Sequence, residues 1–246
     1  MKRLLAKIAY DGSAFSGFAR QRTQGIMSVS ERIEKALKTM GIEDEIIGAG
    51  RTDKGVHATA QMISFCVRKD SNLAKIKTLL NQKLSPHIFI KSIQEVPMDF
   101  HPRFQAKRRA YRYIFGNEFK NPFISKYVSK EKYGDIGRIA EGLELFLGRH
   151  QFSYFKKQGS QTKSDVREIF VARLYQHKIL SEIYNVIYLE AEGFLRAQVR
   201  LMIGAVLAYS RGEISRDAII CQLECKKRAF CVPVSPNGLY LAKIIY

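Results

Sequence analysis

The sequence has little of what a zinc or disulfide protein needs. It contains 4 cysteines in 246 residues, and no two of them form a C-x-x-C pair. Cys221, Cys225 and Cys231 lie close together in the sequence, but no histidine is near them. Zinc sites usually combine closely spaced cysteines with further cysteine or histidine ligands, so we expect no metal site. Cys66 lies in an apolar, strand-like run and is expected to be a small core residue.

Long apolar runs are also missing. No stretch of about 18 consecutive apolar residues could span a bilayer, and the apolar run at residues 4–6 is too short for a signal peptide. A P-loop, a dinucleotide fingerprint and a nucleophile elbow are missing as well. We therefore expect a cytoplasmic protein in a reducing environment, with no membrane association.

Acidic residues are few relative to basic ones. There are 23 Asp and Glu against 41 Lys and Arg, which gives a net charge of +18 that is spread along the chain. Such a field attracts polyanions, of which nucleic acid is the commonest. The alternative is a generally basic surface without a nucleic-acid ligand. A membrane surface fits less well, because no strongly amphipathic, Lys-rich helix stands apart from the core pattern.

The first hundred residues predict the element order β-α-β-β-α-β. Strands are expected at residues 2–10, 45–47, 60–67 and 87–96. One helix should follow Ser28, which forms a capping-box pattern with Glu31, and a second should follow Ser71 or Asn72. This order is typical of a two-layer unit in which helices cover one face of an antiparallel sheet.

The rest of the chain predicts a similar order without sequence identity to the first part. The expected elements are strands at 107–115, 166–176, 183–190 and 238–246, and helices at 135–147, 194–209 and 215–223. The helix at 135–147 should point Ile136, Ile139, Leu143 and Leu147 inward. We expect an α+β fold of two ferredoxin-like halves, residues 1–104 and 105–246, with a mainly antiparallel sheet and a basic cleft for an extended nucleic acid.

Residues 48–65 predict a glycine-rich polar loop that runs into a strand. The loop holds Asp53 among Arg51, Lys54 and His57, and its glycines allow a tight turn or a close approach to a ligand. One interpretation is an ordinary hairpin turn with solvated charges, and the other is a functional site. The residue types in this loop leave both interpretations open.

Two basic segments lie in the second part. In the strand at 107–115, Tyr111 and Tyr113 share one face, and Arg108, Ala110 and Arg112 share the other, a pattern suited to base stacking and phosphate contacts. The alternative is that Tyr113 belongs to the core and the arginines are solvated. In the helix at 194–209, Arg196 and Arg200 should lie one turn apart, beside Gly204. They could pair with a buried carboxylate or extend to solvent along the helix edge.

Together these residues resemble the tRNA pseudouridine synthases of the TruA type, nearly end to end. GRTDKGVHA at 50–58 is the most specific of the matching motifs. The others are YDGSAFSGF at 10–18, FHPRFQAKRRAYRY at 100–113, RHQFSYF at 149–155, Arg167-Glu168-Ile169, GFLRAQVRLMIG at 193–204 and PNGLYLAKIIY at 236–246. The sequence departs from the family pattern at Phe18-Ala19-Arg20-Gln21 and at Leu201, so the contacts of these loops to RNA are left open.

The resemblance implies a homodimer that acts on tRNA and converts uridine to pseudouridine at positions 38, 39 and 40 of the anticodon stem-loop, without a metal or organic cofactor. Asp53 would be the catalytic carboxylate, Tyr111 would stack on the target base, and Arg200 would pair with Asp53. Arg51 would place the flipped nucleotide. The other substrate-binding residues expected from the resemblance are Val56, His57, Arg109, Arg196 and Leu239.

Two other classes of protein have to be weighed. A non-catalytic RNA-binding protein explains the charge and the basic aromatic strand, but it gives no reason for an acid within the glycine-rich loop. A nuclease or phosphotransferase usually needs several carboxylates to hold metal ions. Asp53 has no acidic neighbour in its loop, which disfavours this second alternative.

Overall fold

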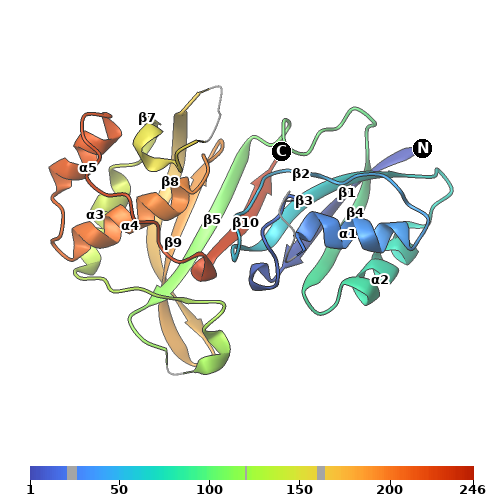
Figure 1. The fold of residues 1–246 in the computed structure, drawn as a ribbon, viewed down its shortest axis with the longest axis horizontal. Coiled ribbons are helices and arrows are strands. Elements are labelled where there is room, and N and C mark those ends of the chain that lie inside the picture. Colours follow the sequence, from blue (N-terminus) through green and yellow to red (C-terminus); the bar gives the residue numbers. More distant parts are fainter. Residues whose placement is uncertain (21–26, 120, 160–163) are drawn as a thin grey trace. The chain divides into compact units, whose positions relative to one another are not determined.

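The chain forms two compact units. The computed structural model describes residues 1–20, 27–119, 121–159 and 164–246. The first unit comprises residues 1–107 and 240–246, and the second comprises residues 108–239. Figure 1 shows the course of the chain through both. This division differs from the expected halves at the closing strand, which belongs to the first unit because it pairs with a strand there.

The first unit has the predicted β-α-β-β-α-β order. Its elements are β1 (Lys2–Tyr10), α1 (Val29–Lys38), β2 (Ile47–Gly48), β3 (His57–Val67), α2 (Leu73–Leu84) and β4 (Ile88–Val96), with a 3₁₀ turn, η1 (Gly12–Ala14). β1 lies between β3 and β4 and runs antiparallel to both. The other edge of β3 is shared: β2 pairs with it antiparallel at Ser64, and β10 (Leu239–Ile245) pairs with it parallel at His57 and Ala58.

The helices of the first unit begin where the sequence predicts. The Ser28 hydroxyl accepts the Glu31 N–H at 3.3 Å, and the Glu31 carboxylate accepts the Ser28 N–H at 2.7 Å, so the capping box is confirmed. Asn72 caps α2 by accepting the Lys75 N–H at 3.0 Å. The two helices lie side by side (Figure 1) and, with the strands, bury a core that includes Leu4, Ile8, Ile33, Leu37, Ile63, Phe65 and Leu80. Cys66 is only half-buried on β3, and this burial raises the pKa of its thiol.

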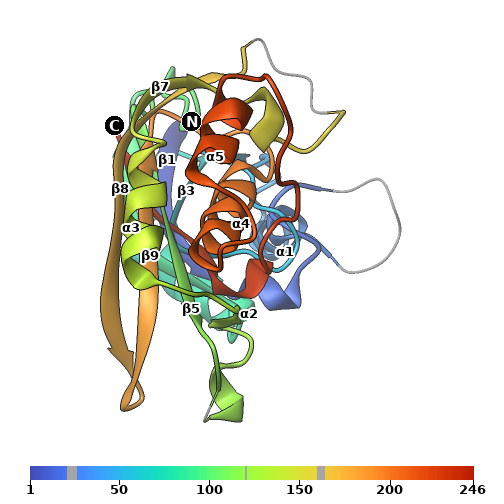
Figure 2. The same ribbon diagram turned by 90° about the vertical axis from the view of Figure 1, so that its left-hand side faces the viewer.

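The second unit contains more elements than expected. They are β5 (Arg108–Gly116), β6 (Ser129–Lys130), α3 (Ile136–Glu144), β7 (Gly148–Gln151), β8 (Val166–Ile179), β9 (Glu182–Ala191), α4 (Gln198–Ser210) and α5 (Arg216–Leu223), with 3₁₀ turns η2 (Pro122–Ile124), η3 (Ser153–Phe155) and η4 (Pro236–Gly238). Its strands lie in the order β5-β9-β8-β7, all antiparallel, and β6 pairs parallel with β5. Figure 2 shows α3, α4 and α5 together on one side of these strands.

Two expectations for the helices of the second unit are wrong. Ile136 and Leu147 are exposed rather than inward, because α3 spans only Ile136–Glu144 and they lie at its first position and beyond its end. α4 begins at Gln198, so Arg196 lies outside it, and the expected one-turn spacing from Arg200 does not exist. Ala197 adopts a left-handed conformation with φ of 60°, which ends the preceding segment before the helix starts.

α4 is enclosed on almost all sides. Every residue from Gln198 to Ser210 is buried except Arg200. A Cβ on Gly204 would lie 2.3 Å from the Val232 carbonyl oxygen, so this glycine makes room for the backbone near residue 232 and not for an arginine. Across the described ranges, the helices are all too short or too polar to cross a bilayer.

Candidate active site

In the first unit, Asp53 lies on the loop that joins β2 to β3. The neighbouring Thr52 is buried; its hydroxyl is hydrogen-bonded to the Tyr10 hydroxyl at 2.8 Å, and its carbonyl accepts the Phe18 N–H at 3.1 Å. On the other side, the Val56 N–H donates to the Asp53 carbonyl at 3.1 Å. The backbone is therefore held on both sides of the carboxylate. Asp53 itself is half-buried.

Two glycines of the motif at 10–18 pack directly against the backbone of this loop. A Cβ on Gly12 would lie 2.0 Å from the Val56 carbonyl oxygen, a distance that no side chain can occupy. Gly17 has φ of +117°, and a Cβ there would lie 3.0 Å from the Thr52 carbonyl oxygen. The motif at 10–18 thus carries glycines because the Asp53 loop packs directly on its backbone.

His57, which the resemblance implies to be a substrate-binding residue, directly follows the loop. It is the first residue of β3 and only 1% exposed. Its Nδ1 accepts the Gly12 N–H at 3.0 Å, and its ring stacks on Tyr240 with the ring centroids 4.8 Å apart. Val56 is also buried, whereas Arg51 and Lys54 are exposed. The geometry of His57 fits a residue that positions the loop.

In the second unit, β5 confirms the predicted alternation of faces. Tyr111 is half-buried and contacts Phe194 edge to face, with the ring centroids 5.3 Å apart. Tyr113, on the same face, is fully buried, so the core interpretation of that residue is correct. Arg109 donates to the Glu192 carbonyl at 2.8 Å. On the opposite face, Arg112 is exposed.

Arg200 and Val234 hold one another through two hydrogen bonds. The Arg200 Nε donates to the Val234 carbonyl at 2.7 Å, and the Val234 N–H donates to the Arg200 carbonyl at 3.2 Å. Leu239, at the start of β10, is buried, and Arg196 is exposed. Of the two arginines expected in this helix, only Arg200 lies within α4, and its side chain contacts Val234.

Glu131 is a residue near Arg200 that sequence reasoning missed. One of its carboxylate oxygens, Oε1, accepts hydrogen bonds from the Tyr113 hydroxyl at 2.6 Å, the Ser129 hydroxyl at 2.8 Å and the Ser235 N–H at 3.1 Å. Burial of Tyr113, and next the charge of Glu131, raise the pKa of the Tyr113 phenol far above its usual range, while the charge of Arg200 opposes this. No local pattern marks Glu131, because its partners come from separate segments.

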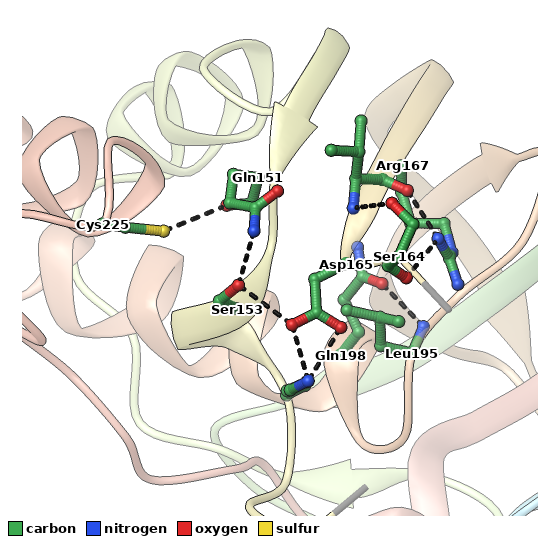
Figure 3. A network of polar contacts seen from close by, with 10 residues as sticks. Gln151, Ser153, Ser164, Asp165, Arg167, Leu195, Gln198 and Cys225 are labelled. Carbon is green, nitrogen blue, oxygen red and sulfur yellow. Dashed lines mark hydrogen bonds and ion pairs between the residues drawn. The ribbon is translucent and has the colours of Figure 1, made fainter. Parts of the chain in front are cut away.

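A second polar network links residues that follow β7 to Asp165, just before β8. Figure 3 shows Asp165 beside Ser153, whose hydroxyl donates to it at 3.0 Å. Lys156 donates to both carboxylate oxygens of Asp165, at 2.6 and 2.8 Å. Close by, the Gln198 side chain accepts the Leu195 N–H at 2.7 Å and so stabilises the turn before α4 (Figure 3).

The departure from the family pattern at Phe18-Ala19-Arg20-Gln21 lies partly outside the described residues. Arg20 is described, and it pairs with Glu34 at 2.6 Å. Gln21 lies outside the described residues, as do residues 160–163, which come after the RHQFSYF segment in the sequence. Within the part of the chain that is described, no group of three or more His, Cys, Asp or Glu side chains is arranged to hold a metal ion.

Comparison with known proteins agrees with this combination of an α+β fold and an acid-bearing loop. The model of the family described as tRNA pseudouridine synthase matches residues 6–105 and 143–246. tRNA pseudouridine synthase A of Helicobacter hepaticus is 46% identical to this chain, and the match covers 98% of this chain and 98% of the relative. The Wolinella succinogenes protein of that name is 43% identical, covering 100% of this chain and 95% of the relative, and that of Helicobacter pylori strain 26695 is 40% identical over 100% of both.

The chain is therefore an isomerase, and it belongs to the tRNA pseudouridine synthase family. Among solved structures, it shows a distant likeness to a chain of the crystal structure of a Cbf5–Nop10–Gar1 complex. The TM-score is 0.36 at 9% identity, over 83% of this chain and 44% of that chain, which is too weak to support an inference.

Proposed function

We propose that this enzyme converts uridine to pseudouridine at positions 38, 39 and 40 of the tRNA anticodon stem-loop. The observation that carries the proposal is Asp53, which stands within the specific motif GRTDKGVHA on a loop whose backbone is fixed by Gly12, Gly17 and their contacts. The net charge of +18 supports a polyanionic substrate. The positions in the anticodon stem-loop rest on the resemblance to the family.

The reaction breaks the N1–C1′ glycosidic bond, turns the base and joins C5 to C1′. A proton leaves C5 and one is gained at N1, so the product is an isomer and no redox partner takes part. The sugar develops positive charge as the bond breaks, as at a glycosidase centre. Asp53 is the carboxylate we assign to this step, and both a nucleophilic and a general-base role require it to be ionised.

Arg200 is the residue we assign to pairing with the Asp53 carboxylate. Charge-assisted hydrogen bonds from a guanidinium to a carboxylate are short and strong, and they give the pair a defined geometry. The hydrogen bond of Arg200 to Val234 uses Nε, one of the five N–H donors of the guanidinium. The proposed pairing therefore needs only the donors of the two terminal nitrogens.

The remaining residues are assigned to holding the nucleotide. Extruding the target base costs a few kcal/mol, and stacking on Tyr111 returns roughly 1–3 kcal/mol. The edge-to-face contact with Phe194 supports the orientation of the Tyr111 ring. Arg51 places the flipped nucleotide, Arg109 and Arg196 contact the RNA, and Val56 and Leu239 form apolar walls. His57 we now assign to positioning the Asp53 loop, because it is buried against Gly12 and Tyr240.

The proposed setting of the reaction is the cytoplasm, where tRNA is the partner, and the proposed active form is a homodimer. Both follow from the resemblance to the family and from the expected reducing environment. Sedimentation of the purified enzyme with and without tRNA tests the second part: a protomer that remains monomeric at working concentrations while it modifies tRNA would contradict the homodimer.

The decisive experiment maps pseudouridine in tRNA from cells that carry the wild-type gene, no gene, or Asp53→Asn. We expect pseudouridine at positions 38–40 only with the wild-type gene. In vitro, Asp53→Asn should reduce the rate roughly 1,000-fold or more while tRNA binding is retained. Asp70→Asn is a matched control, because Asp70 lies on an exposed surface in the same unit. A normal rate in Asp53→Asn, or loss of pseudouridine elsewhere in tRNA, would overturn the proposal.

A further inference from the structure

We propose that Glu131 is a positioning residue of the catalytic centre, which fixes the orientation in which Arg200 meets the catalytic carboxylate. The inference rests on the proposed roles of Asp53 and Arg200. It assigns no contact between Glu131 and the substrate.

Glu131 joins three separate segments of the second unit through one carboxylate oxygen. The donors to its Oε1 are the Tyr113 hydroxyl from β5, the Ser129 hydroxyl from β6 and the Ser235 N–H at the start of η4. The Glu131 backbone is also held, because its N–H donates to the Gly116 carbonyl at 2.9 Å. A half-buried carboxylate with this many donors is fixed in position.

Glu131 and Arg200 are connected through two adjacent residues, Val234 and Ser235. Ser235, which donates to Glu131, directly follows Val234, which exchanges two hydrogen bonds with Arg200. Because the guanidinium is planar and rigid, fixing its Nε against a carbonyl fixes the direction of its two terminal nitrogens. Any movement of the Val234 carbonyl therefore turns the face that the arginine presents to a carboxylate.

Tyr113 supplies the fixed end of this arrangement. Its ring is fully buried and lies 5.8 Å from Phe115, centroid to centroid. Since burial and Glu131 raise the pKa of its phenol, Tyr113 keeps its proton and serves as a permanent donor to Glu131. The Arg200 charge is close enough to act on the same phenol, so the arginine lies within the electrostatic range of this cluster.

A purely structural role for Glu131 predicts something different. In that case, the carboxylate only stabilises the turn at residues 235–238, and its removal lowers stability and weakens the apolar wall at Leu239. Substrate binding would then suffer together with the melting temperature. A positioning role predicts that the rate of the chemical step falls while the affinity for tRNA is kept.

The test uses Glu131→Gln in the full chain, with steady-state kinetics on tRNA. We expect kcat to fall about 10–100-fold, the size of effect that a small misplacement of a catalytic group produces, with KM changed less than about twofold. Glu141→Gln is the matched control, because Glu141 also accepts a tyrosine hydroxyl, that of Tyr209, at 2.7 Å in the same unit. It should leave kcat unchanged.

Arg200→Ala allows a double-mutant cycle. If Glu131 acts through Arg200, Glu131→Gln should cost less than about twofold in kcat when Arg200 is already alanine, since coupled residues are not additive. Equal costs in both backgrounds would overturn the inference. So would a wild-type kcat in Glu131→Gln, or a raised KM with kcat kept.

Tyr113→Phe provides a second variant should Glu131→Gln fold poorly. It keeps the ring and removes one donor, so we expect a fall in kcat of about two- to tenfold, the effect of one hydrogen bond. A wild-type kcat in both variants, with Asp53→Asn inactive and kcat measurably reduced in Arg200→Ala, would overturn this inference alone. Activity in Asp53→Asn would instead overturn the proposed function.

Discussion

The two units hold their charged residues in different ways. In the first unit, Asp53 depends on main-chain hydrogen bonds and on glycines that allow two loops to touch. In the second unit, Arg200 depends on a backbone carbonyl that is held in turn by the side chains around Glu131. Both arrangements join residues that are distant in the sequence, but the first relies on main-chain atoms and glycines, and the second relies on side-chain hydrogen bonds. A backbone-built loop should therefore tolerate substitution least.

Among substitutions outside the proposed catalytic residues, the largest effect should come from Gly12→Ala. The new Cβ would meet the Val56 carbonyl oxygen at 2.0 Å, so either η1 or the Asp53 loop has to move. We expect activity to fall about 100-fold, as for other misplaced catalytic groups, and stability to fall by about 1–3 kcal/mol. Kinetics on tRNA and urea unfolding measure these two quantities.

Gly41→Ala is the control for Gly12→Ala. Gly41 has φ of +73°, but a Cβ there would meet nothing within 4 Å. It should therefore show only the backbone cost of about 1–2 kcal/mol and normal activity. Wild-type activity in Gly12→Ala would show that the Asp53 loop does not depend on the close approach of Gly12 to the Val56 carbonyl.

The next effect concerns His57. His57→Leu leaves the buried Gly12 N–H without its acceptor, which should cost about 1–3 kcal/mol of stability and lower activity about tenfold. His57→Asn places an oxygen near the position of Nδ1 and should recover part of both losses. Thermal unfolding and kinetics on the two variants test this expectation. Equal losses would mean that stacking on Tyr240, and not the hydrogen bond, is what His57 contributes.

Asp165→Asn tests whether a side-chain hydrogen-bond network also stabilises the second unit far from Glu131 in the sequence. The substitution leaves Lys156 with a neutral partner in a half-buried network (Figure 3). We expect a loss of about 1–2 kcal/mol in urea unfolding, since this pair is less exposed than a surface ion pair. Asp70→Asn, whose Arg68 pair is exposed, should change nothing measurable. The same loss in both variants would contradict the role of burial.

The smallest effect should come from Ser28→Ala. The hydroxyl of Ser28, and next its N–H, lower the pKa of Glu31 below its usual value of 4.5. A lowered folded-state pKa gives stability above the unfolded pKa, and this stability is lost as the pH falls through the folded pKa. We expect a loss of about 0.5–1 kcal/mol at pH 7 that shrinks at pH 3 in urea unfolding.

Asn72→Ala is the matched control for this pH dependence. Asn72 caps α2 with an amide oxygen and without a carboxylate partner, so its loss should be the same at both pH values. A pH-independent loss in Ser28→Ala would show that Glu31 adds nothing to the cap.

The predictions from sequence succeeded where the signal is local. The order of the first unit, the Ser28 capping box and the β5 alternation all depend on residues within a few positions of one another. β6 and β7 were missed because strands of two and four residues show no usable alternation. The start of α4 was missed because residues 194–209 read as one continuous apolar helix, while nothing marks Ala197 for its left-handed conformation.

The site shows the same limit. GRTDKGVHA identified the acid loop, because a motif is a local signal. His57 was expected to bind substrate because of the resemblance to the family. Its burial depends on Gly12 and Tyr240, which are distant in the sequence. Glu131 could not be predicted for the same reason, because it meets Tyr113 and Ser235 only in the folded chain.

Because β10 pairs with β3, the first unit can be completed only late in translation. Residues 1–107 emerge first, but the edge of β3 at His57 receives Tyr240 only after the whole second unit has been translated. The late segment is then fastened at its far end, where the Lys107 N–H donates to the Ile245 carbonyl at 2.8 Å and the Tyr246 hydroxyl donates to the Pro102 carbonyl at 3.1 Å. A nascent chain interrupted before residue 240 therefore carries the motif GRTDKGVHA without the strand that completes its unit.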